Sequence, residues 1–287
     1  MIEQSQHHAG KIFGITYFLS LLVIGVAFSR FYAPYLVWEN GEETARHFIT
    51  HEQSVRIYLA GAFLYGAGVI VQLTALYVIL RQVNRGIALF AAFSRLIYVF
   101  FWFVLVLYIF YALRLVGGAG SLMTFGPDRL AALAGSQLDS SRDAYYIGMA
   151  FNGLGLALFA SVFFQSRYIP RALAVWGVLA SLYEAFCGFA YLFYPHFGTI
   201  LSVNWYEYPL MSFEVLLSLW LLFRGLRSPC SSQRSLSSCC AALNSLEEIL
   251  VVFIFWFLSE SEMCLALNCA CPTKADEDCA ANSMAYV

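Results

Sequence analysis

Charged residues are scarce in this sequence. Only 12% of its 287 residues are Asp, Glu, Lys or Arg, whereas 61% are hydrophobic. A soluble domain usually carries about a quarter charged residues. The apolar residues are gathered in long blocks, which is typical of a polytopic membrane protein, so we expect the lipid bilayer to be the main partner. No basic cluster is present and the net charge is −2, so nucleic-acid binding is not expected.

Motifs for enzymatic chemistry are also lacking. The sequence contains no phosphate-binding glycine-rich loop, no nucleophile elbow and no convincing catalytic triad, and no cofactor is expected. One weak metal pattern is present: Glu43, His47 and His51 recur at four-residue spacing, which places them on one face of a helix. A solvated loop is the alternative interpretation of this stretch and the one that we favour.

Histidine is absent from the last part of the chain, where cysteine is concentrated. Seven of the eight cysteines, all but Cys187, follow Pro229, and their spacings match no common zinc pattern. The apolar run at 249–258 is too short to span a bilayer comfortably. The sequence therefore predicts a membrane domain over 1–227, followed by a loosely structured Ser- and Cys-rich tail over 228–287.

Long apolar segments dominate the first 227 residues. None shows the alternation of a barrel strand, so we expect α-helices, whose backbone groups are satisfied internally. The predicted fold is an all-α, polytopic bundle of six transmembrane helices, at about 12–33, 55–80, 87–113, 144–164, 171–194 and 208–224. The long segment between the third and fourth spans, 117–143, is interpreted as a connecting loop at the outer surface, with a short helix around DRLAALA as the alternative.

The loops between these spans differ in charge. Two short connections, RQVNRG (81–86) and QSRYIPR (165–171), are basic, and FRGLR (223–227) follows the sixth span. The other loops are longer, and the first is acidic. Basic residues in short loops near span ends remain in the cytoplasm. We therefore expect a multi-pass protein of the cell membrane with both termini in the cytoplasm.

Several stretches resemble a bacterial membrane-protein family called domain of unknown function 4386. They are FNGLGLALFASVFFQSRYIPRALAVWGVL, then FEVLLSLWLLFRGLR with its glutamate ahead of a Ser/Leu/Trp run, and LTALYVILRQVNRGIALFAAFSRLIYV. The resemblance covers roughly residues 10–227 and includes the turn SRYIPR after the fourth helix. It implies a six-helix integral membrane protein. It implies no activity, because the family's name records none.

Arg95 lies inside the apolar run AAFSRLIYVFFWFVLVLYIF, where a charge is costly. Counting 1.5 Å per residue from the inner ends of the spans places it about 12 Å deep. Gln72 comes to a similar depth, and Glu214, Asn152 and Glu184 come to about 15, 18 and 20 Å. Small residues share the helix faces of these polar groups, and such faces contact neighbouring helices. The sequence therefore predicts an intramembrane polar layer of five residues.

We expect the Arg95 guanidinium to pair with Glu214, with Glu184 as the second choice. Gln72 or Asn152 is expected to accept from its remaining N–H groups. In one interpretation, these residues form structural contacts that fix the register of neighbouring helices. The protein would then be a structural or assembly component of the membrane. The other interpretation makes the layer a pocket for transport or sensing of a small molecule, or a proton relay, and intramembrane ionisable groups favour this function. The sequence identifies no ligand, and a membrane-embedded enzyme is the third hypothesis.

Overall fold

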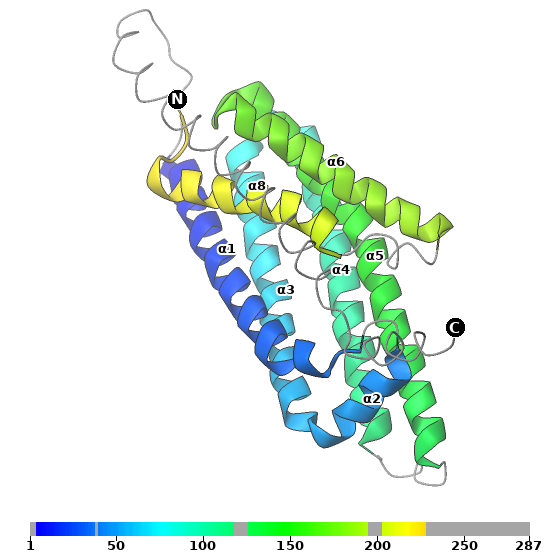
Figure 1. Cartoon of the computed structure of the whole chain (residues 1–287). Helices are drawn as coiled ribbons and strands as arrows, with labels where there is room; N and C mark the ends of the chain where they lie inside the picture. The colour runs from blue at the N-terminus through cyan, green and yellow to red at the C-terminus, as the bar shows by residue number, and fades with distance from the viewer. Residues whose placement is uncertain (1–3, 38–39, 118–125, 195–202, 228–287) are drawn as a thin grey trace, which may run out of the picture. The chain divides into compact units, whose positions relative to one another are not determined.

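The computed structural model describes residues 4–37, 40–117, 126–194 and 203–227, and these residues are mostly helical, without a strand. The all-α fold class is confirmed. The described helices are α1 (Gln4–Phe31), the 3₁₀ turn η1 (Ala33–Tyr35), α2 (Gly41–Thr50), α3 (Glu52–Leu80), α4 (Arg85–Val116), α5 (Pro127–Ser166), α6 (Arg171–Phe193) and α8 (Val203–Phe223). Figure 1 shows α1, α3, α4 and α5 side by side, with α6 and α8 running obliquely across them. The predicted tail over 228–287 lies outside the described residues.

Five of these helices, α1, α3, α4, α5 and α6, are long and apolar enough to cross a membrane. Each satisfies its own backbone hydrogen bonds, as a spanning segment must. α8 is not among them: it corresponds to the sixth predicted span, but it contains two glutamates and an internal proline, Pro209. The count of six spans therefore stays a prediction.

The interpretation of 117–143 as a connecting loop is wrong from Pro127 onward, because α5 begins there and continues without a break to Ser166. Buried residues in the first half of α5 follow helical spacing: Leu130, Ala131, Ala134 and Leu138. Part of this face packs in one hydrophobic cluster with Ala45 and Phe48 of α2. The stretch that we interpreted as a solvated loop around His47 is also helical, because α2 occupies it.

Small residues lie where the helices approach most closely, as the sequence predicted. A Cβ added to Gly68 would lie 2.1 Å from Ser20 Oγ of α1, and one added to Gly153 would lie 2.4 Å from the Ser181 carbonyl oxygen of α6. The α2–α5 contact is equally close, because a Cβ on Gly41 would lie 2.6 Å from the backbone oxygen of Gly135. Close backbone approach of this kind is how membrane helices associate.

One end of the bundle gathers helix termini that are distant in sequence. The buried side chain of Gln6 donates from Nε2 to the Ile79 carbonyl oxygen (2.7 Å), which joins the start of α1 to the end of α3. The backbone N–H of Arg227, beyond α8, donates to the Tyr168 carbonyl oxygen (3.0 Å), beyond α5. This end carries the basic connections of the sequence: Lys11, Arg81, Arg85, Arg167, Arg171, Arg224 and Arg227.

Candidate functional site

Five helices contribute one residue each to the polar layer: Gln72 (α3), Arg95 (α4), Asn152 (α5), Glu184 (α6) and Glu214 (α8). The first four are buried, and the Arg95 side chain is only 2% exposed. The Glu214 side chain retains 13% exposure. The four buried side chains therefore point into the helix bundle, and Glu214 is mostly covered by it.

Arg95 forms the ion pair that the sequence predicted. Its Nη1 lies 3.2 Å from Oε1 of Glu214, which joins α4 to α8. The N–H is not aligned with the carboxylate oxygen, so the contact is electrostatic and neither atom gains a hydrogen bond. Nε of Arg95 also has no hydrogen-bond partner. The pair neutralises the charge of Arg95 without using its donors fully.

Glu184 belongs to a second pair. Nδ2 of Asn152 lies 3.2 Å from both carboxylate oxygens of Glu184, which joins α5 to α6. The expectation that Asn152 accepts from Arg95 is therefore wrong, because the amide is turned to the carboxylate instead. Gln72 does not bond Arg95 either, and its Nε2 has no partner among the described residues. The layer consists of two separate pairs and one unpaired amide.

Gly155 determines how closely Arg95 approaches α5. A Cβ added at this position would lie 2.7 Å from Cγ of Arg95 and 3.0 Å from the backbone oxygen of Ala91. Any larger residue would therefore displace the arginine stem. Because Gly155 lies three residues after Asn152, the same face of α5 supports both pairs.

Three tyrosines near the layer were missed by the sequence reasoning, which associated tyrosine with the membrane boundaries. Tyr17 and Tyr65 interact electrostatically with both Arg95 and Glu214. The hydroxyl groups of Tyr65 and Tyr98 lie 3.3 Å apart. The sequence spacing could have identified two of them. Tyr98 follows Arg95 by three residues and Tyr65 precedes Gln72 by seven, so each tyrosine lies on the same helix face as that residue of the layer.

The layer contains more polar atoms than the surrounding side chains satisfy. Among the described residues, the buried side-chain atoms without a hydrogen-bond partner are Gln72 Nε2, Arg95 Nε and Nη1, Asn152 Oδ1, Ser181 Oγ, Glu214 Oε1, Ser218 Oγ and Trp220 Nε1. Ser181 lies three residues before Glu184, and Ser218 four residues after Glu214, so both flank the layer. Arg95 Nη1 and Glu214 Oε1 neutralise each other in the ion pair, whereas each of the other groups costs about 1–3 kcal/mol when it is left unpaired.

The weak metal pattern is not assembled. Glu43 accepts from Nδ2 of Asn40 (3.1 Å), and Nδ1 of His47 lies 3.2 Å from the Tyr35 carbonyl oxygen. His51 stacks on the Tyr35 ring, with 4.0 Å between ring centroids. Within the described ranges, no three His, Cys, Asp or Glu residues come together as metal ligands. The hypothesis of an enzyme with a metal on α2 therefore gains no support from the geometry.

Comparison with known proteins gives one match. The family model described as domain of unknown function (DUF4386) matches residues 12–225, which contain all five members of the polar layer. No curated protein and no solved structure matches the chain.

Proposed function

This chain belongs to the DUF4386 family, and we propose that it is a multi-pass protein of the cell membrane that transports or senses a small polar molecule through its buried polar layer. The proposal goes beyond the family assignment, which carries no activity. It is supported by the long apolar helices, by the distribution of charge and by the unpaired atoms of the layer.

The charge distribution supports a cytoplasmic position for the end that contains both the start of α1 and the end of α8. Basic residues in short connections orient membrane proteins with that end inside. The opposite end contains the ion pairs of the α2 region, including Arg46 with Glu42 and Asp128, both at 2.9 Å. α8 returns to the basic end, because Arg227 bonds the backbone of Tyr168. We infer that α8 is the sixth crossing.

The unpaired polar atoms carry the functional part of the proposal. A polar layer with a purely structural role is expected to satisfy its own donors and acceptors, because burying an unpaired polar group is costly. Here Arg95 Nε, Gln72 Nε2 and Asn152 Oδ1 each lack a hydrogen-bond partner among the described residues. Donors and acceptors are both represented, so a small polar molecule, or water in a proton relay, would complete the set. A large or apolar ligand does not fit this chemistry.

A structural role is the second candidate, and the packing around Arg95 favours it. Gly155 leaves no room for even a methyl group beside the arginine stem. A closed, tightly packed layer would fix helix register without admitting a solute.

Access of a small polar reagent to the layer distinguishes the two candidates. Ser181 is fully buried on α6 and Cys is nearly isosteric with it, so Ser181→Cys in a background lacking the native cysteines places a thiol beside Glu184. We expect iodoacetamide to alkylate this thiol in the folded protein, as measured by mass spectrometry. Ala160→Cys, in the apolar core on α5, is the matched control and should react only after unfolding. Equal protection of both thiols would exclude a solute-accessible layer and leave the structural role.

A further inference from the structure

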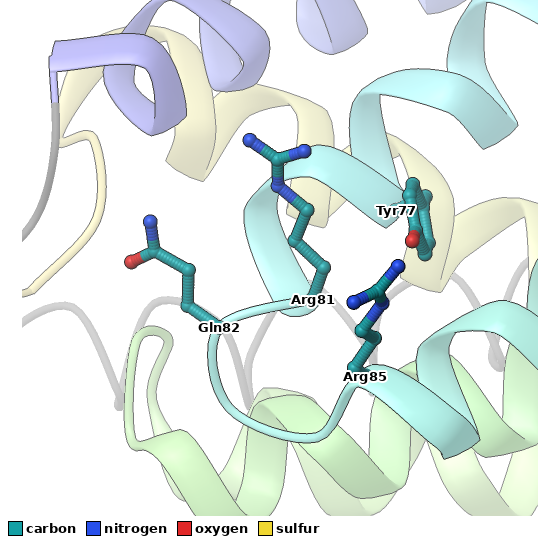
Figure 2. Close-up of a pocket in the computed structure, with 4 residues that line it drawn as sticks. All are labelled: Tyr77, Arg81, Gln82 and Arg85. Atoms are coloured by element: carbon teal, nitrogen blue, oxygen red, sulfur yellow. The ribbon is translucent and has the colours of Figure 1, made fainter.

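The turn between α3 and α4 borders an open crevice of about 380 Å³ lined by Tyr77, Arg81, Gln82 and Arg85. Figure 2 shows the Arg85 guanidinium beside the Tyr77 ring and the Arg81 side chain extending to the same side of the turn. Both arginines are exposed. The crevice therefore presents two guanidinium groups, a phenol and an amide to the surroundings.

A tight connection brings these side chains together. Val83 N–H donates to the Leu80 carbonyl oxygen (2.9 Å), and Asn84 caps α4 by accepting from the Ile87 N–H (3.0 Å). Arg81 is the C-cap residue that follows α3, and Arg85 is the first residue of α4. The two guanidinium groups are therefore held at the mouth of one turn by the backbone.

Arg85 is placed where a cation is unfavourable. The N-terminus of a helix carries partial positive charge, and the first turn of α4 contains no acidic residue. The ion pairs of the described chain involve other arginines, at positions 46, 56, 95 and 142. Neither Arg81 nor Arg85 has a carboxylate partner in that part of the chain. Two like charges beside a helix N-terminus create a local positive potential that favours an anion.

An apolar stripe on α4 continues from the crevice. Exposed hydrophobic residues follow Arg85 at helical spacing along one face: Leu89, Phe93, Ile97 and Phe100, of which Phe100 is 63% exposed. The opposite face of α4 carries Ala88, Ala92 and Arg95 and is buried in the bundle. An anion with an apolar tail would therefore place its charge in the crevice and its tail along this stripe.

We propose that the crevice binds the phosphate group of an anionic membrane phospholipid between Arg81 and Arg85, with an acyl chain lying along the α4 stripe. Guanidinium groups bind phosphate oxygens in bidentate fashion, and basic pockets at helix ends bind acidic lipid headgroups. Free phosphate shares the headgroup chemistry, but it has no acyl chain to lie along the stripe, so the two ligands are distinguished by the test. The site is separate from the polar layer and does not depend on the proposed function.

The test measures lipid binding to the full chain in detergent by native mass spectrometry, with phosphatidylglycerol, phosphatidylcholine and inorganic phosphate as probes. We expect phosphatidylglycerol to bind more tightly than phosphatidylcholine. Arg81→Gln with Arg85→Gln should weaken phosphatidylglycerol binding roughly 30-fold, from the usual contribution of two basic residues near an anionic lipid. Arg167→Gln with Arg171→Gln removes the same charge from the other basic turn and should leave most of the affinity.

Three outcomes would overturn the proposal. Equal weakening by the two double variants would show that general surface charge attracts the lipid. Equal binding of phosphatidylglycerol and phosphatidylcholine to the wild-type chain would show that the headgroup charge is not recognised. Inorganic phosphate that displaces the lipid at equal concentration would identify free phosphate as the ligand. Circular dichroism of each variant checks that the helices are retained, and Arg81→Lys with Arg85→Lys, which keeps the charge, should preserve partial binding.

Discussion

Replacing Glu214 by leucine leaves the Arg95 guanidinium without a counter-charge inside the helix bundle. The Arg95 side chain is 2% exposed, so water cannot take the place of the carboxylate. Breaking a buried ion pair by removing one partner typically costs about 3–5 kcal/mol. The 3.2 Å contact lacks hydrogen-bond alignment, and Glu214 is slightly exposed. We therefore expect a loss at the lower end of that range, about 3 kcal/mol in the free energy of unfolding.

The double variant Arg95→Met with Glu214→Leu removes both charges together. Methionine retains the unbranched stem that packs against Gly155. Replacing a buried ion pair by apolar residues of similar volume is often nearly neutral. We expect the double variant to unfold within about 1 kcal/mol of the wild type, so it should be more stable than Glu214→Leu alone. The pair would then show a coupling energy of about 2 kcal/mol or more.

The assay is reversible unfolding in mixed detergent micelles by titration with sodium dodecyl sulfate, followed by circular dichroism. Glu52→Leu is the matched control, because it breaks the exposed ion pair between Arg56 and Glu52 (2.6 Å), where the loss should stay below about 1 kcal/mol. A double variant less stable than Glu214→Leu would refute the reasoning. It would mean that the two polar side chains stabilise the bundle through contacts other than with each other.

Two further predictions concern packing and topology. Gly155→Val should lower the free energy of unfolding by about 1–3 kcal/mol through overpacking against Arg95. Gly25→Val is the control, because the space around Gly25 is open and the stability should change little. The same titration measures both variants. Stability unchanged by Gly155→Val would mean that α5 can withdraw from α4. Reporter fusions at Asn84 and Ser136 should report opposite sides of the membrane, and the same side for both would contradict the proposed orientation.

The membrane helices and the Arg95 pairing were predictable from the sequence. Both follow from the free-energy cost of burying polar or charged groups away from water. An apolar block of about 20 residues can be satisfied only as a buried or lipid-facing helix. A charge within it requires a partner at similar depth, and counting residues along each helix gave Glu214. The same counting could not distinguish which carboxylate the Asn152 amide bonds, because depth does not determine the rotation of one helix against another.

The region of α2 and the start of α5 was less predictable, because these two helices bury their apolar residues against each other. The segment before Ala144 is polar, and its few apolar residues bury only when α2 covers them. α2 in turn has little apolar surface of its own, apart from residues such as Phe48. Its approach to α5 depends on the glycine contact of Gly41 with Gly135. The helical spacing of the apolar residues is visible within each segment, but it does not show which segments, about 90 residues apart in the chain, pack together.

α5 is one unbroken helix that connects the contacts with α2 to the contacts with α6. Its 40 residues extend about 60 Å, roughly twice the thickness of the hydrocarbon core. The N-terminal half packs against α2, and Asn152 lies in the C-terminal half, 25 residues from Pro127, or about 37 Å along the axis. Because α5 is one continuous helix, its contact with α2 at Gly135 and its contact with α6 at Gly153 are parts of the same rod. The position of the Asn152 amide beside Glu184 is therefore linked to the packing of α2 through the backbone of α5.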